Sequence, residues 1–429
     1  MIHLNYSAPD FENQFRALTE RPAFDPVVDA AVARILDGVR EHGDQALVHY
    51  AKKFDGVDLT PEQFRVTEDE LEEARQTIEP DIRKAIRKGC TQLREFSEQR
   101  VPKPWSNSPR KGVIVGERFA PLNRVAAYVP GGTAPLISTV LHTVTLASTA
   151  NVEEIVVVTP PGPDGKIHPA ILYAANHAGA TEIYRLGGVY AIAALAYGTE
   201  SIRKVEKIVG PGNAYVTSAK KQVYGETSLD LVAGPSEIMI LADESADPAF
   251  IAADMLSQVE HGSGHEQAVL ATDSKTLINS VEKSLLRQLE TLQRADFIRK
   301  CLDDGVFFIE VPNLDTGAEV ASRYAPEHLE IICKRSGFVA KKVTAAGAIF
   351  LGPWTPEPVG DFVAGPSHVL PTGGAARFFS GLTVEHFFRR MSVVNYQRSA
   401  LNRELEMIEA FADAEGLDAH GRSASIRFD

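Results

Sequence analysis

The feature that most constrains the fold is a regular alternation of short apolar runs and helical segments that begins at Val113. Runs rich in β-branched residues end in glycine or proline and alternate with segments of helical length, as in EEIVVVTPP, HPAILYAANHAGA, TEIYRLGG, VYAIAALAYG and VEKIVGPGN. Such an alternation over roughly 120 residues is typical of a parallel α/β sheet. In sheets of this kind, ligands bind beyond the carboxyl ends of the strands.

A second alternating set runs from SEIMILAD through AFIAADMLSQVEH and AVLAT to GAIFLG. Residues 26 to 100 have apolar side chains at helical spacing, with breaks expected at Gly38 and Gly43. This helical segment is a candidate for the helices that cover the sheet of the second set. The domain would then be built from two separate parts of the sequence. The last fifty residues, from TVEHFFRRMSVVNY on, are expected to be helical with a polar tail. A chain of 429 residues exceeds the usual size of a single core, so two or three domains are expected.

Composition excludes several classes of function. The net charge of -13 disfavours nucleic acid and anionic membranes as partners. The three cysteines form no CxxC pair, which argues against a disulfide framework and a thiolate zinc site. No apolar run reaches about 18 residues, so no membrane span is expected. The opening MIHLNYSAPDFENQFR does not have the pattern of a signal peptide, and a cytoplasmic location is predicted.

Glycine- and proline-containing loops follow several of the expected strands. They are VPGGTAP, GPGNAY, AGPSE and AGPSH, whereas the G-x-G-x-x-G dinucleotide motif is absent. Glycine permits close backbone approach and proline stiffens a turn, so each loop alone is explained by ordinary turn chemistry. Four such loops together favour a binding site at a sheet edge.

The stretch LSQVEHGSGHEQAV contains two histidines four residues apart, His261 and His265. The glycines between them should end the helix at about Glu260 or His261, which excludes a helical chelate by the two histidines. Gln258 and His261 share a face of the last turn. An amide oxygen and an imidazole nitrogen can form half of a metal site, although a polar helix end is the simpler alternative.

Two further stretches contain candidate catalytic groups. In RYAPEHLEII, Glu327 and His328 are adjacent and point in different directions, so they suit two chemical steps rather than one. The alternative is a helix start with a glutamate near its positive end. The loop EPVGDFVAGPSHVLPTGG offers Glu357, Asp361 and His368.

The C-terminal stretch EGLDAHGRSASIR offers Glu415, Asp418 and His420. A polar terminal segment is by default only solvated.

Taken together, the chain resembles the histidinol dehydrogenase family. Seven segments occur in the family's order: YVPGGTAPL, GPGNAYV, AGPSEI, SQVEH, RYAPEHLE, GDFVAGPSHVLPTGG and LDAHGRSASIR. The resemblance implies an α/β fold of two incomplete Rossmann-like domains with small N- and C-terminal helical extensions that embrace a partner in a homodimer. The expected parts are an extension at 1–25, a catalytic domain of 26–127 and 236–382, an NAD-binding domain at 128–235 and a dimerisation tail at 383–429.

The resemblance also assigns residues. It implies one Zn²⁺ per subunit held by Gln258, His261, Asp361 and His420. It gives acid–base roles to Glu327 and His328. It implies substrate contacts from Ser236, Glu357, His368 and Glu415, together with His328 and the four zinc ligands. It implies NAD contacts from Tyr128, Asn213 and Tyr190, the last departing from the glutamine of many members.

The implied reaction oxidises L-histidinol to L-histidinal and then to L-histidine with two NAD, the last steps of histidine biosynthesis. Glu415 and His420 are expected to serve the active site of the other subunit, so that the homodimer shares its sites. One alternative is a related zinc- and NAD-dependent enzyme for a sulfonated diol, which has little reason to keep Glu357 and Glu415 against an anionic substrate. The other alternative is an inactive metal-binding homologue, which should have lost Glu327, His328 or a metal ligand.

Overall fold

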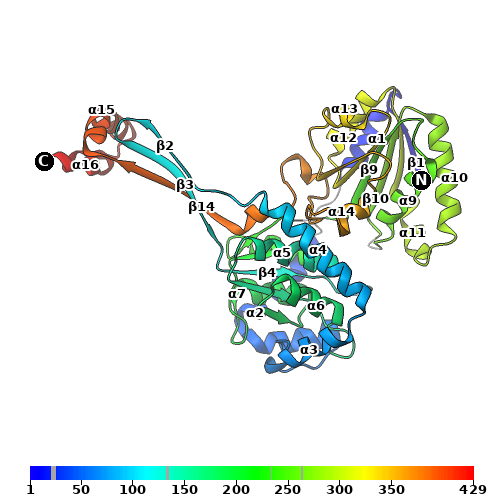
Figure 1. Cartoon of the computed structure of the whole chain (residues 1–429), viewed down its shortest axis with the longest axis horizontal. Coiled ribbons are helices and arrows are strands. Elements are labelled where there is room, and N and C mark those ends of the chain that lie inside the picture. Colours follow the sequence, from blue (N-terminus) through cyan, green and yellow to red (C-terminus); the bar gives the residue numbers. More distant parts are fainter. Residues whose placement is uncertain (21–25, 132–134, 233, 262–263) are drawn as a thin grey trace.

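The computed structural model of the chain describes residues 1–20, 26–131, 135–232, 234–261 and 264–429. It contains two parallel sheets, each covered by helices, and an arm that projects away from both (Figure 1). The predicted α/β class is therefore confirmed. Among the described residues, no helix is both long enough and apolar enough to cross a bilayer.

The first sheet has five parallel strands in the order β6-β5-β4-β7-β8. The strands are β4 (Arg124–Tyr128), β5 (Glu154–Val158), β6 (Glu182–Tyr184), β7 (Lys207–Val209) and β8 (Ser228–Leu229). The helices between them are α5 (Ile137–Thr149), α6 (Pro169–Ala178), α7 (Gly188–Tyr197) and α8 (Ala214–Val223). These elements coincide with the alternation in the sequence. Because the strands are parallel, the loops after β4, β5, β6 and β7 meet at one edge of the sheet.

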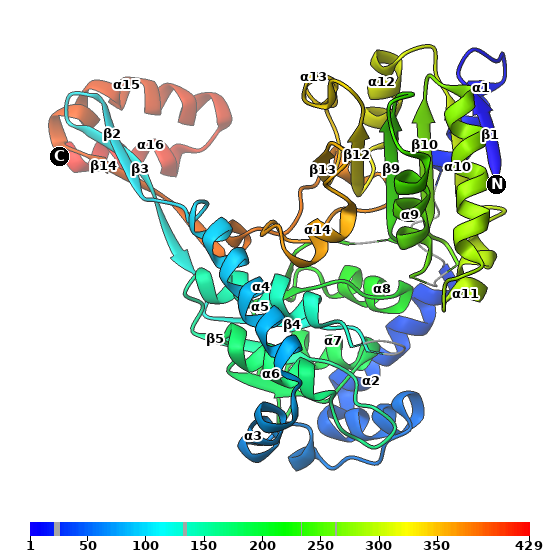
Figure 2. The same cartoon turned by 45° about the vertical axis from the view of Figure 1, so that its right-hand side comes forward.

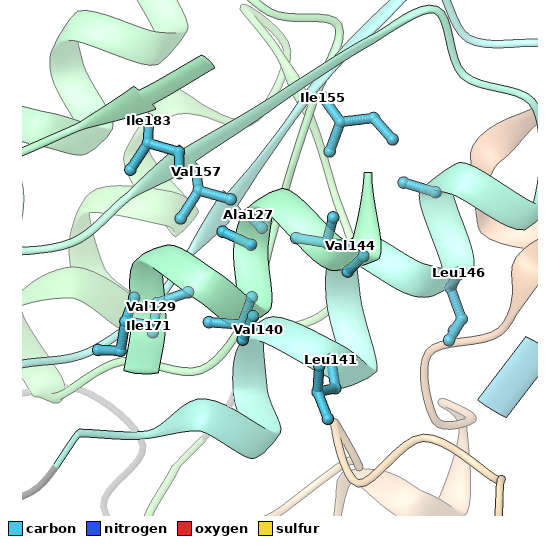
Figure 3. Packing of buried hydrophobic residues seen from close by; sticks show 14 of the residues in the cluster. Ala127, Val129, Val140, Leu141, Val144, Leu146, Ile155, Val157, Ile171 and Ile183 are labelled. Atoms are coloured by element: carbon cyan, nitrogen blue, oxygen red, sulfur yellow. The ribbon is translucent and has the colours of Figure 1, made fainter. Parts of the chain in front are cut away.

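Three N-terminal helices also belong to this first domain, namely α2 (Pro26–Tyr50), α3 (Glu68–Thr77) and α4 (Pro80–Glu98). Helix α2 packs on α7 and α8, α3 packs on α6, and α4 packs on α5 and α6. The predicted grouping of 26–127 with 236–382 is thus wrong. The apolar stripes of these helices instead complete the two cores on either face of the five-stranded sheet, one of which Figure 3 shows. The expected break in α2 occurs at Gly43, which has φ +50°, and not at Gly38.

The second sheet has six parallel strands in the order β1-β11-β10-β9-β12-β13. Its strands are β1 (Ile2–Asn5), β9 (Glu237–Ala242), β10 (Gln267–Thr272), β11 (Val306–Glu310), β12 (His328–Ile332) and β13 (Ala348–Leu351). One face is covered by α9 (Pro248–Val259), α10 (Lys275–Leu289) and α11 (Ala295–Cys301). The other is covered by α1 (Phe11–Thr19), α12 (Leu314–Tyr324) and α13 (Ser336–Ala340).

The N-terminus is therefore an integral part of the second domain and not the separate extension predicted at 1–25. Strand β1 pairs in parallel with β11, so the edge strand of the sheet comes from the very start of the chain. Leu4, Phe11 and Phe15 are buried in the core on one face of this sheet. Backbone pairing and apolar burial together hold this segment in the domain.

The arm is built from an antiparallel three-stranded sheet and two terminal helices (Figure 1). Its strands are β2 (Trp105–Arg110), β3 (Val113–Pro121) and β14 (Phe388–Tyr396), and its helices are α15 (Arg398–Glu415) and α16 (Asp418–Ser425). The prediction that the segment from Thr383 on is helical is wrong for 388–396. That segment is a strand because β3 supplies an antiparallel partner from Phe388 to Tyr396.

Candidate active site

The acid–base pair predicted from the sequence lies at the amino end of the six-stranded sheet. Helix α12 ends at Tyr324, Ala325 has a left-handed conformation (φ 52°), and Pro326 cannot continue a helix. The chain therefore turns directly into β12, which begins at His328. Glu327 and His328 are both buried.

The neighbouring strand β9 fixes the carboxyl group of Glu327. The backbone N–H of Glu237, the first residue of β9, donates a hydrogen bond of 3.0 Å to Glu327 Oε2. Nδ1 of His328 lies 3.8 Å from the same oxygen. The two adjacent side chains thus meet in one buried space although they leave the backbone in different directions.

Helix α9 brings the predicted amide and imidazole to the same place. Its last helical residue is Val259, and Glu260 follows as the cap, which confirms the predicted helix end. Gln258 is fully buried; its Oε1 lies 3.1 Å from His328 Nδ1, and its Nε2 lies 3.5 Å from His261 Nδ1. One amide group therefore connects the two histidines. His265 is exposed, and residues 262–263 between the histidines lie outside the described part of the chain.

A short helix, α14 (Glu357–Phe362), supplies two carboxylates. Glu357 and Asp361 are four residues apart and share one face. One donor atom from each of these residues and one from His328 lie within 4.8 Å of one another. The backbone N–H of Glu357 donates to Glu330 Oε1 (2.7 Å), and this bond ties the start of α14 to strand β12.

His368 links this cluster to the first domain. Its Nδ1 lies 3.6 Å from Asp361 Oδ1. Its ring stacks on that of His142 on α5 with centroids 4.2 Å apart, and its backbone N–H donates to His142 Nδ1 (3.0 Å). The site therefore lies where α14 and the following loop meet the first domain (Figure 2).

Two supporting residues were missed by sequence reasoning. His142 sits within the apolar run VLHTVTLA, and Glu330 within the strand HLEII. A polar group inside a buried apolar element is the signal that could have found both, since such groups require partners.

Burial dominates the electrostatics of the cluster. It lowers the pKa of His328 to about 4, so this imidazole is neutral at neutral pH. It raises the pKa of Glu327 well above the ordinary value, with the charge of Glu237 adding to the effect. It likewise raises the pKa of Glu357, together with the charge of Asp361. Burial opposes the ionisation of Asp361, yet the neighbouring His368 holds the pKa of Asp361 well below its usual range.

Two buried atoms of the cluster have no hydrogen-bond partner in the described part of the chain, His328 Nε2 and Glu357 Oε1. They lie 3.8 Å apart. Buried polar atoms are normally hydrogen-bonded, so this pair indicates a space that a polar ligand enters. Amide oxygen, imidazole nitrogen and carboxylate oxygen form a donor set that suits zinc.

The structure places Gln258 in contact with both His261 and His328, and it places Asp361 in a group of donor atoms with His328 and Glu357 that does not include His261. It does not bring His420 to them. His420 lies on α16 and Glu415 at the end of α15, at the far end of the arm (Figure 1). Within one chain the predicted ligand set is therefore incomplete.

The predicted cofactor residues lie at the loop-bearing edge of the five-stranded sheet. Tyr128 ends β4, and Asn213 caps α8 by accepting the backbone N–H groups of Tyr215 and Val216, both at 3.1 Å. Tyr190, in the first turn of α7, is 1% exposed. Ser236, which was predicted to contact the substrate, lies one residue before β9 and is half-buried.

Comparisons with known proteins bear on this arrangement. The sequence profile described as histidinol dehydrogenase matches residues 19–428. The chain belongs to the histidinol dehydrogenase family. It is 44% identical to a histidinol dehydrogenase of Heliobacterium mobile over 426 residues, which covers 99% of each chain. It is 46% identical to one of Bacillus cereus over 403 residues, covering 94% of this chain and 93% of the relative.

A solved structure agrees with this membership. The crystal structure of histidinol dehydrogenase from Elizabethkingia anophelis superimposes with a TM-score of 0.93 at 33% identity, covering 100% of this chain and 98% of that one. The similarity therefore includes the arm and both sheets.

Proposed function

We propose that the chain oxidises L-histidinol to L-histidinal and then to L-histidine with two NAD, the last steps of histidine biosynthesis. The observation that carries this proposal is the buried cluster in which Glu327, His328 and Glu357 converge beside Gln258. A neutral imidazole and a high-pKa carboxyl group in one enclosed site are the groups that a two-step proton-transfer reaction requires.

His328 is the proposed base of both steps. An amide oxygen only accepts, so the bond to Gln258 Oε1 places the proton of His328 on Nδ1 and leaves the lone pair on Nε2. That nitrogen is the one without a hydrogen-bond partner in the described chain. It takes the hydroxyl proton of the alcohol, and then a proton of the aldehyde hydrate.

Glu327 is the proposed group that activates water for the second step. Its carboxyl group is held by the backbone N–H of Glu237, and burial raises its pKa, which makes its carboxylate form a stronger base. The position of Glu327 beside His328 lets it act on the water that adds to the aldehyde carbon.

Carboxylates of the site match the charge of the substrate. Glu357 faces His328 Nε2, and Glu415 is the proposed contribution of the arm. L-histidinol carries an ammonium and an imidazole, and both groups form strong hydrogen bonds with carboxylates.

Zinc and NAD are the proposed cofactors. Gln258, His261, Asp361 and His420 would hold one Zn²⁺. The contact between Gln258 and His261 and the position of Asp361 beside His328 support this assignment. When bound, zinc would orient and polarise the substrate hydroxyl, while NAD accepts the hydride. Tyr128 and Asn213 lie at the sheet edge where a dinucleotide fits the fold.

The arm supports a homodimer with shared active sites. It carries exposed apolar side chains that a partner subunit would cover, among them Trp105, Ile114, Val394, Met407, Phe411 and Ile426. His420 cannot complete the metal site of its own chain in the arrangement observed. We propose that it completes that of the partner subunit. A cytoplasmic location without nucleic-acid or membrane partners completes the proposal.

The reaction itself can be tested directly. We expect the purified chain to form two NADH per L-histidinol consumed, and to lose most of this activity after treatment with a zinc chelator. Absorbance at the NADH band together with product analysis measures both. Activity on L-histidinol that survives complete zinc removal would contradict the proposed metal, and the absence of any NADH would contradict the function.

The metal ligands predict a difference between two histidines of one stretch. Replacing His261 by alanine should lower zinc content at least about tenfold, since loss of a ligand removes much of the binding free energy. The matched variant His265→Ala should retain one zinc per chain, because His265 lies outside the proposed ligand set. Metal analysis after dialysis measures the content. Equal loss in both variants would instead support coordination by both histidines.

A further inference from the structure

A pocket of about 710 Å³ lies at the loop-bearing edge of the five-stranded sheet, away from the His328 cluster. Its walls include Gly131 after β4, Thr159 and Pro160 after β5, and Asp55 at the end of a π-helical turn, Ala51–Asp55. The volume is within the range of small-molecule and cofactor sites. Thr159 Oγ1 is buried and has no hydrogen-bond partner among the described residues. This hydroxyl indicates that a polar ligand enters the pocket.

Asp55 lines the pocket and is also hydrogen-bonded to Tyr190 on α7. Its Oδ2 accepts a hydrogen bond from the hydroxyl of Tyr190. The same hydroxyl accepts the backbone N–H of Gly187 at 3.2 Å. Since a phenol has a single proton, its bond to Asp55 leaves the oxygen lone pairs of Tyr190 for Gly187.

The next residue is held in the same way. The hydroxyl of Tyr128 accepts the backbone N–H of Gly188 at 3.2 Å. Two tyrosine hydroxyls thus take the first two N–H groups at the start of α7, which in a Rossmann-type fold are free to bind an anion. The backbone N–H groups that follow β6 are therefore bonded to tyrosine side chains of the same chain.

Gly187 packs closely against Pro160, which forms part of the pocket wall. A Cβ built on Gly187 would lie 2.5 Å from Pro160 Cβ, and one built on Gly131 would lie 2.3 Å from Pro160 Cγ. Pro160 therefore sits between two backbone segments without free space. A shift of Gly187 must move Pro160, which lines the pocket.

We infer that Asp55 is a positioning residue for the dinucleotide: it holds the Tyr190 hydroxyl, which holds Gly187 and thereby the Pro160 wall of the pocket. The inference rests on the proposed NAD-dependent function. Tyr190 acts indirectly, because it is 1% exposed and its hydroxyl is already engaged. Burial raises the pKa of Asp55, so this carboxylate is costly to keep without its partner.

The test measures cofactor binding separately from activity. NADH fluorescence titration should show about fivefold weaker binding for Asp55→Ala, the effect of one lost hydrogen bond. Tyr190→Phe removes the bonds to both Asp55 and Gly187 and should weaken binding at least as much. Asp55→Asn keeps a neutral acceptor and should recover most of the affinity. The KM for NAD should rise in parallel, with kcat within about twofold and zinc content unchanged, since a positioning effect on binding leaves the chemistry intact. Asp58→Ala is the control, because Asp58 is exposed and pairs with Lys52 at the surface.

The double variant Asp55→Ala/Tyr190→Phe should bind NADH no more weakly than Tyr190→Phe alone, because the bond that Asp55→Ala removes is already absent in Tyr190→Phe. Additive losses would overturn the inference, as would lower melting temperatures with unchanged NADH affinity in both single variants. An unaltered chain that binds no NADH would overturn the proposed function as well. If the unaltered chain binds NADH and both single variants bind it with the same affinity, only the role of Asp55 is overturned.

Discussion

Mixing subunits that carry His328→Ala with subunits that carry His420→Ala is expected to restore activity that neither variant has alone. His328 lies at the amino end of β12, whereas His420 lies on α16 at the far end of the arm. If the arm serves the partner, a mixed dimer has one site with both lesions and one site with none. Random reassociation of equal amounts gives half mixed dimers, so about a quarter of the unaltered activity should return.

The experiment requires unfolding or dilution and reassociation of the two variants, followed by the NADH assay. Each variant reassociated with itself is the control. If His420 instead served its own chain, every site in the mixture would keep one lesion and the mixture would stay inactive. That result would contradict the shared site. An arm with apolar side chains exposed along the strands, on α15 and at both ends of α16 is expected to require such a partner, because exposed apolar surface of this extent is unusual in a monomer.

Replacing Glu327 by glutamine is expected to abolish mainly the second oxidation, whereas His328→Asn should impair both. Glutamine keeps the size of Glu327 and an acceptor for the N–H of Glu237, yet it cannot take a proton from water. Loss of a general base reduces a rate by about 100- to 10,000-fold. His328→Asn removes the nitrogen that faces Glu357, and both proton transfers depend on it.

Supplying L-histidinal directly to each variant separates the two steps. Glu327→Gln should oxidise L-histidinal very slowly while still binding zinc and NADH, and His328→Asn should be slow with either substrate. A matched control is Glu260→Gln, which changes a carboxylate at the end of α9 outside the proposed acid–base pair. Unimpaired oxidation of L-histidinal by Glu327→Gln would contradict the role assigned to this residue.

Local sequence patterns were sufficient for most of the α/β elements. The alternation from Val113 predicts the strands from β4 to β7 and the helices α6 and α7, because apolar periodicity and glycine- or proline-bearing loops reflect local backbone preferences. The end of α9 is also local, since two glycines close behind Glu260 disfavour further helix. The motifs for Gln258, His261, Glu327 and His328 could be recognised for the same reason.

Partners distant in the sequence decided the rest. The apolar stripe of α2 could cover either sheet, and only its fit to α7 and α8 assigns it to the first domain. Residues 388–396 have no decisive local pattern and become a strand because β3 provides backbone hydrogen-bond partners.

The same distinction applies to the site. The sequence by itself determined which chemical groups the chain has and, through short-range spacing, that Gln258 and His261 share a helical face. Only the tertiary structure decided that His328 bonds to Gln258, that His142 supports His368 from the other domain, and that Tyr190 is bonded to Asp55. It also placed His420 far from the other proposed ligands. Contacts between residues far apart in the chain depend on how whole apolar faces pack, and short-range periodicity carries no information about which faces meet.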